Sequence, residues 1–282
     1  MDRFDWLEFD EKGSKRIPNI SVATALPTDG PGCYKIGRQM RNAGYFKDAA
    51  AYFQKSIGYD EHNHAAWVER IDSLVRANAL AEANVVSEQA LSAYRKVRAL
   101  YASRALVLGH MGHFEEAQNL SQISIEPPEN LWYARCVRGE LHLLEDVDRR
   151  FEAVQWFDEA LRVSNDRWEP ALLAGWALLN AGLSTWAAAY FAESAHLNAR
   201  VPISWLYLGD TFASLRLYEP AAFYYNRALE LDPGNEPAKE RLSRVKSRFF
   251  GLFNAFIPEN LQKRWQRAEK RLGTPDRSSW IE

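Results

Sequence analysis

Apolar residues recur at helical spacing through most of the chain. Between Leu206 and Ala238 they fall three or four positions apart in two stretches, with a short turn-forming sequence between them. This is the spacing of amphipathic helices, which bury one stripe of side chains and expose the others. The segment is therefore expected to form two helices joined by a turn. It contains no glycine-rich phosphate loop and no nucleophile placed beside a base.

The same two-helix pattern returns along the chain with a nearly constant period. A step of 34 residues back from Gly209 reaches Gly175, and a step of 36 residues from there reaches Gly139. The two extra residues fall in LLEDVDRRF, where the turn between two helices is expected. Three further steps of 34 residues reach Ala105, Ile71 and Gly37. A period of this length indicates a repeat protein, in which each two-helix unit stacks on the next.

Small residues also recur in the second helix of every unit. One position holds alanine in all six units, at Ala49, Ala83, Ala117, Ala153, Ala187 and Ala221. Four residues later, four of the units carry an aromatic ring, at Phe53, Phe157, Phe191 and Tyr225. A bulky side chain at a helix crossing would hold the two backbones apart, so the alanines mark the expected crossings. The second and third units have Ser87 and Ser121 in place of the ring, and these units are expected to stack more loosely.

Turn signals agree with this division into helices. The sequences NAGYF, HMGHF and NAGLS each place a glycine at the expected end of a first helix. A left-handed residue commonly ends a helix, and glycine adopts that conformation at the lowest cost. The sequence LDPGN is expected to stop the last of the second helices.

The residues from Trp205 to Pro233 resemble the tetratricopeptide repeat family. The pattern of that family has Trp, Leu-Gly and Tyr in the first helix, Ala and Phe in the second, and a late Pro. The matching residues are Trp205, Leu208, Gly209, Phe212, Ala221, Tyr225, Ala228 and Pro233. The resemblance implies an all-α, right-handed α-solenoid of about six helix-turn-helix repeats, closed by a C-terminal capping helix or helices. The expected repeats are 30–63, 64–97, 98–131, 132–167, 168–201 and 202–235.

The resemblance also implies a concave groove, lined by the first helices, that binds a peptide or helix of a partner protein. The residues expected to line it are Tyr34, Lys35, Arg38, Arg41, Arg76, Tyr133, Val137, Leu172, Leu173, Trp176, Leu179, Tyr207 and Asp210. This groove is expected to be basic at its N-terminal end and apolar in its C-terminal half. The alternative is that the apolar residues pack against neighbouring helices or the chain's own tail. Arg38 and Asp72 stand where one chaperone-binding subgroup has the Asn of a carboxylate clamp, which argues against that subgroup.

Residues 1–29 form an acidic, aromatic arm and linker. The stretch MDRFDWLEFDEKG interleaves acidic residues with aromatic rings and lacks the apolar segment of a signal peptide, and a linker with Pro and Gly follows it. One hypothesis is that the arm docks into the chain's own groove, or into that of a neighbour, and competes with the partner. The alternatives are that its rings cap the first repeat or that it is disordered.

Residues 236–282 are expected to form basic capping helices and a tail. Ala238, Leu242, Val245 and Phe249 follow helical spacing, and a second helix is expected over 258–273. Ten Lys or Arg and only four Glu lie between positions 236 and 272. A basic amphipathic helix can bind an anionic membrane surface or a nucleic acid. The alternative is a solvated face on a helix that covers the last repeat.

Composition excludes several classes of function. The net charge of −2 gives no overall attraction to nucleic acid or to anionic membranes. Two cysteines far apart form neither a disulfide framework nor a zinc motif, and no apolar run reaches the ~18 residues of a membrane span. The cluster DEHNH at 60–64 lies in an expected loop, and His110 and His113 have no catalytic partners at a suitable spacing. No enzyme activity, metal, cofactor or small-molecule substrate is therefore expected.

The expected function is that of a non-catalytic, cytoplasmic adaptor or scaffold that binds a segment of another protein in its groove. One version is chaperone-like and shields an aggregation-prone partner. The alternative from another class is a peripheral membrane or nucleic-acid binding protein that acts through the basic C-terminal helices, although the overall charge disfavours it. Exposed aromatic residues on the terminal helices make a homodimer a further possibility.

Overall fold

The computed structural model describes residues 27–126 and 131–253, and their secondary structure is entirely helical. The first eight elements are α1 (Gly30–Asn42), α2 (Phe46–Tyr59), α3 (His64–Arg76), α4 (Leu80–Ala93), α5 (Arg98–His110), α6 (Phe114–Ile125), α7 (Trp132–Glu145) and the short 3-10 helix η1 (Val147–Arg149). The others are α8 (Arg150–Val163), α9 (Trp168–Asn180), α10 (Ser184–Leu197), α11 (Pro202–Ser214), α12 (Tyr218–Leu231) and α13 (Glu236–Phe253). The prediction of an all-α helical repeat solenoid is confirmed.

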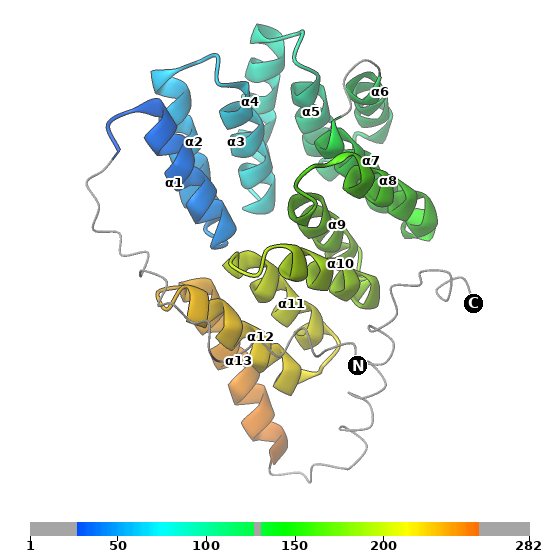
Figure 1. Ribbon diagram of the computed structural model, residues 1–282. Coiled ribbons are helices and arrows are strands. Elements are labelled where there is room, and N and C mark those ends of the chain that lie inside the picture. Colours follow the sequence, from blue (N-terminus) through cyan, green and yellow to red (C-terminus); the bar gives the residue numbers. More distant parts are fainter. Residues whose placement is uncertain (1–26, 127–130, 254–282) are drawn as a thin grey trace.

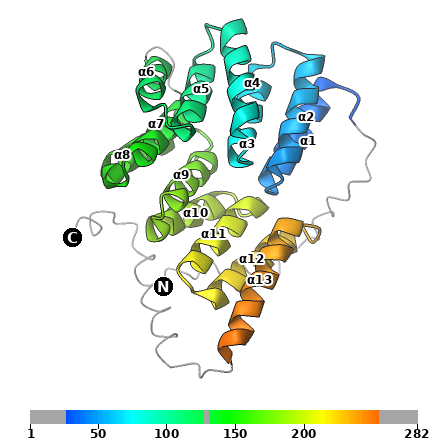
Figure 2. The same ribbon diagram turned by 180° about the vertical axis from the view of Figure 1, so that it is seen from behind.

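The described helices form six antiparallel pairs, called here repeats one to six, followed by α13. Each second helix packs against the first helix of its own pair and against that of the next pair. Figures 1 and 2 show that the pairs stack in chain order along a curve that returns on itself. As a result, α1 of repeat one contacts α11 of repeat six. The solenoid therefore closes into a ring.

A glycine and an aromatic ring fit together inside four of the repeats. A Cβ atom added at Gly37 or Gly175 would lie 2.7 Å and 2.8 Å from the rings of Phe53 and Phe191, which is too close for two carbon atoms. The pairs in repeats four and six are as tight. The glycines of the first helices thus make room for the aromatic side chains predicted in the second helices.

Repeat two solves the same packing problem with the sizes exchanged. In repeat two, Ile71 replaces the glycine and Ser87 replaces the ring, and both are fully buried. The guanidinium of Arg104, from the next repeat, also enters this space. Its Nη1 lies 3.0 Å from the carbonyl oxygen of Asn84 and 3.1 Å from Ser87 Oγ. Polar contacts therefore supplement apolar packing where the aromatic side chain is missing.

The turns within the repeats end their first helices as predicted. Gly44, Gly112 and Gly182 have φ values of 88°, 84° and 78°, in the left-handed region. The equivalent positions in repeats two and six are Asn78 and Arg216, at φ values of 57° and 60°. Repeat four has the two extra residues at this point, and η1 occupies the turn. The LDPGN sequence follows the end of α12, as expected.

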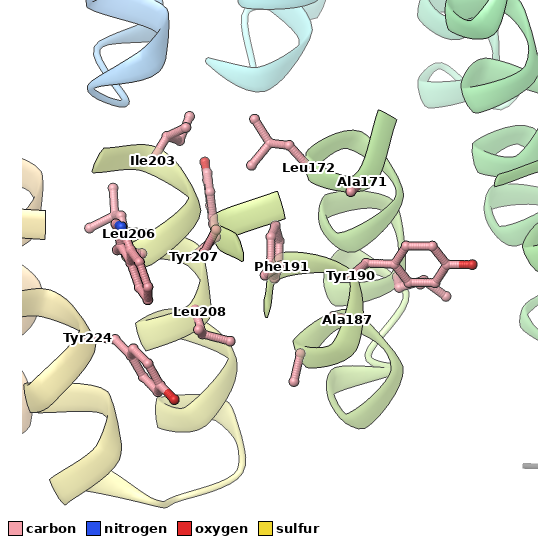
Figure 3. Packing of buried hydrophobic residues seen from close by; sticks show 14 of the residues in the cluster. Ala171, Leu172, Ala187, Tyr190, Phe191, Ile203, Leu206, Tyr207, Leu208 and Tyr224 are labelled. Carbon is pink, nitrogen blue, oxygen red and sulfur yellow. The ribbon is translucent and has the colours of Figure 1, made fainter. Parts of the chain in front are cut away.

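Two hydrophobic clusters form the core. One extends from Ala50 to Leu141 and the other from Leu143 to Val245. Figure 3 shows the second cluster, where the rings of Phe191 and Tyr207 stack with centroids 5.6 Å apart. These contacts join repeat five to repeat six, so the C-terminal half of the closed solenoid is a continuous packed body.

Helix α13 covers the end of repeat six, and three of the residues predicted to face that repeat do so. Ala238, Leu242 and Val245 are buried in the second cluster. The arm before residue 27, the side chain of Phe249 and the helix expected at 258–273 lie outside the described residues. Cys33 and Cys136 are buried free thiols. Within the described part of the chain, no helix is both long and apolar enough to cross a membrane.

Candidate partner-binding groove

Two clusters of charged residues lie on the concave face, between first helices. The first is the ring-closing cluster, made of Arg38 and Arg41 on α1, Glu69 on α3 and Glu169 on α9. The Glu69 carboxylate accepts from Arg38 at 2.7 Å and from Arg41 at 2.8 Å. Glu169 accepts from the same two arginines, with its Oε1 2.8 Å from Arg41 Nη2. Two guanidiniums from repeat one thus share one carboxylate from repeat two and one from repeat five.

The ring-closing cluster is largely shielded from water. Side chains of Arg41, Glu69 and Glu169 are about 10% exposed, whereas that of Arg38 is 30% exposed. Burial alone would lower the pKa of Arg41, but the carboxylates of Glu69 and Glu169 outweigh it and raise that pKa. Arg41 therefore stays charged and depends on both carboxylates. Removing one partner of such a buried pair commonly costs about 3–5 kcal/mol.

The second is the central cluster, made of Asp72 and Arg76 on α3, His110 on α5 and Glu140 on α7. The two terminal nitrogens of Arg76 lie 3.0 Å and 3.1 Å from the two carboxylate oxygens of Glu140. Arg76 also pairs with Asp72 at 3.2 Å, and His110 Nε2 lies 2.9 Å from Glu140. Burial opposes the ionisation of Glu140, yet Arg76 and His110 hold its pKa at about 2.

Arg76 connects the central cluster to α9. Its guanidinium carbon lies 3.7 Å from the ring centroid of Trp176, which is the geometry of a cation–π contact. Trp176 lies on the same helix as Glu169, so α9 contacts both clusters. A helix from repeat five is thus held against repeats one and two at two points.

A seam of uncharged contacts closes the ring beside these clusters. Asn235 donates to the carbonyl oxygen of Ala43 at 2.8 Å. The Tyr45 hydroxyl donates to the Gly234 carbonyl at 3.2 Å and accepts from the Glu236 N–H at 2.9 Å. Gly44 lies against Leu206 across the same seam. The turn between α1 and α2 therefore packs where α12 meets α13.

The space left between these contacts is small. A cavity of about 20 Å³ is lined by Arg41, Phe46, Asp72, Arg76, Leu172, Leu173, Trp176, Ile203 and Tyr207. This volume holds about one water molecule. This cavity is therefore too small to hold a peptide.

The structure brings together seven of the residues predicted to line the groove. Arg41, Arg76, Leu172, Leu173, Trp176 and Tyr207 surround the cavity, and Arg38 lies in the adjoining ring-closing cluster. Predicted basic residues do gather at the N-terminal end, but acidic residues of the same chain pair with them. Two of these acidic residues, Glu140 and Glu169, were not predicted to line the groove. Glu140 could have been found, because it occupies the same repeat position as Arg38 and Asp72.

The other six predicted residues lie elsewhere. Tyr133 and Val137 are buried in the first hydrophobic cluster, out of reach of a partner. Tyr34 packs on Phe53, while Lys35 is exposed. Leu179 packs against the second cluster. Asp210 faces α13, as described next.

Asp210 contacts the basic C-terminal region. It pairs with Arg241 at 2.8 Å and accepts from the Tyr225 hydroxyl at 2.7 Å. Lys239 and Arg244 pair with Glu236 and Glu240 on α13 itself. Part of the positive charge that suggested membrane or nucleic-acid binding is therefore neutralised within the chain.

The described residues include no group of three or more His, Cys, Asp or Glu side chains placed to hold a metal ion. His62, from the DEHNH cluster, lies on the surface with its ring 5.8 Å from that of Tyr94. His110 belongs to the central cluster, where its partner Glu140 is already held by Arg76. The charged residues of the concave face thus act as ion pairs that join helices.

Comparison with known proteins identifies one repeat directly. The family model described as tetratricopeptide repeat matches residues 203–235, which include all of α12 and all of α11 except Pro202. A search of curated proteins finds no match. Solved structures are also similar to this chain. YrrB, described as a TPR protein with an unusual peptide-binding site, is 18% identical, with a TM-score of 0.38, over 67% of this chain and 96% of its own.

The Cut9–Hcn1 hetero-tetramer of the APC/C is 16% identical, with a TM-score of 0.43, over 77% of this chain. The match spans 42% of the chain in that structure. A tetratricopeptide repeat protein from Parabacteroides merdae is 17% identical, with a TM-score of 0.33, over 77% of this chain and 98% of its own. Likeness at this level carries no information about partners.

Proposed function

Because the chain is a tetratricopeptide repeat protein, we propose that it is a non-catalytic scaffold that binds a segment of another protein on its concave surface. Stacked repeats of this kind form extended concave binding surfaces. The observation that carries the proposal is the set of half-buried apolar side chains beside the two charged clusters. Leu173 and Trp176 are the half-buried members on α9, and Phe46 faces the same cavity from repeat one.

Binding at this surface requires the ring to open. The contacts that close it are the four-residue ring-closing cluster, the Arg76–Trp176 contact and the seam at Ala43–Phe46. Most of these contacts are polar. Buried ion pairs contribute little net stability compared with well-packed apolar contacts, since desolvation offsets the attraction between the charges. A partner that makes similar contacts in their place can therefore open the ring at a small net cost in free energy.

Two finer points belong to the same proposal. A chaperone-like action would follow if the bound segment is apolar and the opened groove shields it from other chains. We place the protein in the cytoplasm because its two free, buried thiols suit a reducing compartment. A homodimer is also proposed. The side chains of Phe223 and Tyr59 are at least half exposed and would supply its apolar contacts on the outer face.

A pull-down from native cell extract, read by mass spectrometry, tests the proposal. The wild type is compared with the double variant Leu173→Asp, Trp176→Ala and with the outer-face control Phe223→Ser. Circular dichroism first establishes that all three proteins are equally helical. We expect one protein to be retained by the wild type and the control and to be lost by the groove variant. Equal retention by all three would contradict binding at the concave surface.

A further inference from the structure

One face of α9 has the layout of a helical ligand. Glu169, Leu172, Leu173 and Trp176 stand at positions i, i+3, i+4 and i+7 of a single helix. These are the anchor positions of a helix that lies in the groove of another protein. All four face repeats one and two or the cavity beside them. The N-terminal repeats therefore hold a helix of their own chain in the manner of a bound partner.

Each anchor has a defined place on the N-terminal repeats. Glu169 lies between the guanidiniums of Arg38 and Arg41. Trp176 stacks under the guanidinium of Arg76. Leu172 and Leu173 line the cavity together with Phe46 of α2. Figure 3 shows Leu172 extending from α9 toward the helices of repeats one and two.

The opposite face of α9 packs within the C-terminal half of the chain. Its residues Trp168, Ala171, Ala174, Ala177 and Leu178 are buried in the second hydrophobic cluster. The anchor Leu172 also belongs to this cluster, and Trp176 packs against it. Because this face packs within repeats four to six, α9 keeps its place in the C-terminal half when the ring opens. Opening then frees the site on repeats one and two without unfolding the helix that had filled it.

The charges define what can replace α9. Without Glu169, Arg38 and Arg41 share the single carboxylate of Glu69. A buried guanidinium that lacks a counter-charge is strongly unfavourable. The replacing segment must therefore bring a carboxylate to the position of Glu169, and large apolar side chains to the positions three, four and seven residues later.

We propose that repeats one and two bind an acidic amphipathic helix of a partner protein, with an acidic, two aliphatic and one aromatic anchor spaced like those of α9. In the free protein, α9 occupies this site. The inference rests on the proposed function and adds the chemistry of the partner. It also implies that the partner and α9 compete, so that affinity depends on how often the ring is open.

A labelled peptide and the full-length chain provide the test. The peptide carries Glu, Leu, Leu and Trp at the spacing of the four anchors on an Ala/Lys background, and fluorescence anisotropy reports its binding. The control peptide has Gln in place of Glu. The variant Glu169→Gln weakens the binding of α9 to repeats one and two. The variant Tyr45→Phe weakens the seam and leaves both charged clusters unchanged. We expect each variant to bind the peptide about tenfold more tightly than the wild type, because each raises the open fraction.

Adding Arg41→Gln to the Glu169→Gln variant is expected to abolish this binding, and the control peptide is expected to bind at least about tenfold more weakly. Undiminished binding after Arg41→Gln, or equal binding of both peptides, would overturn the proposal. It would also be overturned if no variant bound the peptide. Light scattering tests a second copy of the chain as the occupant. If the Glu169→Gln variant forms a dimer, and adding Arg41→Gln abolishes that dimer, the occupant is a second copy and the partner helix is excluded.

The peptide test and the pull-down can fail separately. If the peptide does not bind while the groove variant still loses a natural partner, the concave surface binds a segment of other chemistry. In that case only this inference is lost. If the peptide binds as described but extracts yield no groove-dependent partner, the site on repeats one and two exists and the proposed function is the part in doubt.

Discussion

At the scale of single residues, five of the six described repeats have residues of complementary size at two facing positions. Where the first position is glycine, the second is an aromatic ring, as in Gly175 and Phe191. Where the first is Ile71, the second is Ser87. The volume shared by two crossing helices is nearly constant, so an increase on one helix is matched by a decrease on the other. Each residue is visible in the sequence, but their pairing across the helix crossing is seen only in the structure.

This complementarity predicts opposite effects for two similar substitutions. Gly175→Ala would place a Cβ 2.8 Å from Phe191, so we expect it to lower the free energy of unfolding by about 1–3 kcal/mol. Gly58→Ala, in the exposed part of α2, meets no atom within 4 Å. It should raise that free energy by up to about 1 kcal/mol, because alanine favours the helix. Urea denaturation of both variants measures the difference, and destabilisation of similar size in both would refute the explanation.

At the scale of helices, pattern and period account for most of what is seen. The starts of the first helices, the left-handed glycines and the buried face of α13 all follow from apolar spacing and turn residues. Two details do not. Asn78 and Arg216 adopt the left-handed conformation without glycine. Asn does so more readily than most residues, whereas at Arg216 the repeat imposes the turn on a residue that disfavours it. The ionic contacts between helices were also missed, because charged residues look like solvent-exposed ones in a sequence.

Glu140 joins three first helices, and this gives a pH prediction. It accepts from Arg76 on α3 and pairs with His110 on α5, and its pKa in the folded state is about 2 instead of the ordinary 4.5. A carboxylate whose pKa is depressed by folding stabilises the fold above pH 4.5 and loses this contribution as pH falls toward 2. The full contribution at neutral pH is about 3 kcal/mol.

The variant Glu140→Gln lacks this contribution at every pH. The difference in unfolding free energy between wild type and variant should therefore be largest near pH 6 and fall by about 1 kcal/mol by pH 3.5. Urea titrations across that range give the difference, with the exposed Glu116→Gln as a control that should match the wild type throughout. A difference that stays constant with pH would show that Glu140 stabilises the helices by shape and not by charge.

At the scale of the whole molecule, the concave surface was predicted and its closure was not. The first helices bring Arg38, Arg41, Leu172 and Trp176 to one face, as the repeat pattern indicates. One of the two carboxylates that bind Arg41 is that of Glu169, 128 residues along the chain. Whether two such distant residues meet depends on a small rotation added at every repeat. No local pattern reports that sum, so the sequence predicts an open groove where the structure has a ring.

If charge pairing holds the ring closed, reversing one charge should open it. In the variant Glu169→Lys, a buried ammonium faces the guanidiniums of Arg38 and Arg41, and like charges this close repel strongly away from water. We expect small-angle X-ray scattering to show a larger radius of gyration and maximum dimension than in the wild type. Circular dichroism should stay unchanged, because the helices keep their neighbours within each half.

The control for that measurement is Glu88→Lys, which makes the same change of charge at an exposed position on α4 and should leave the scattering curve unaltered. Identical curves for all three proteins would mean that the seam between Ala43 and Asn235 suffices to close the ring. The ring-closing cluster would then serve only to orient α9. An open Glu169→Lys form beside a closed control would instead show that access to the concave surface depends on the carboxylate between Arg38 and Arg41, which is the position a partner must fill.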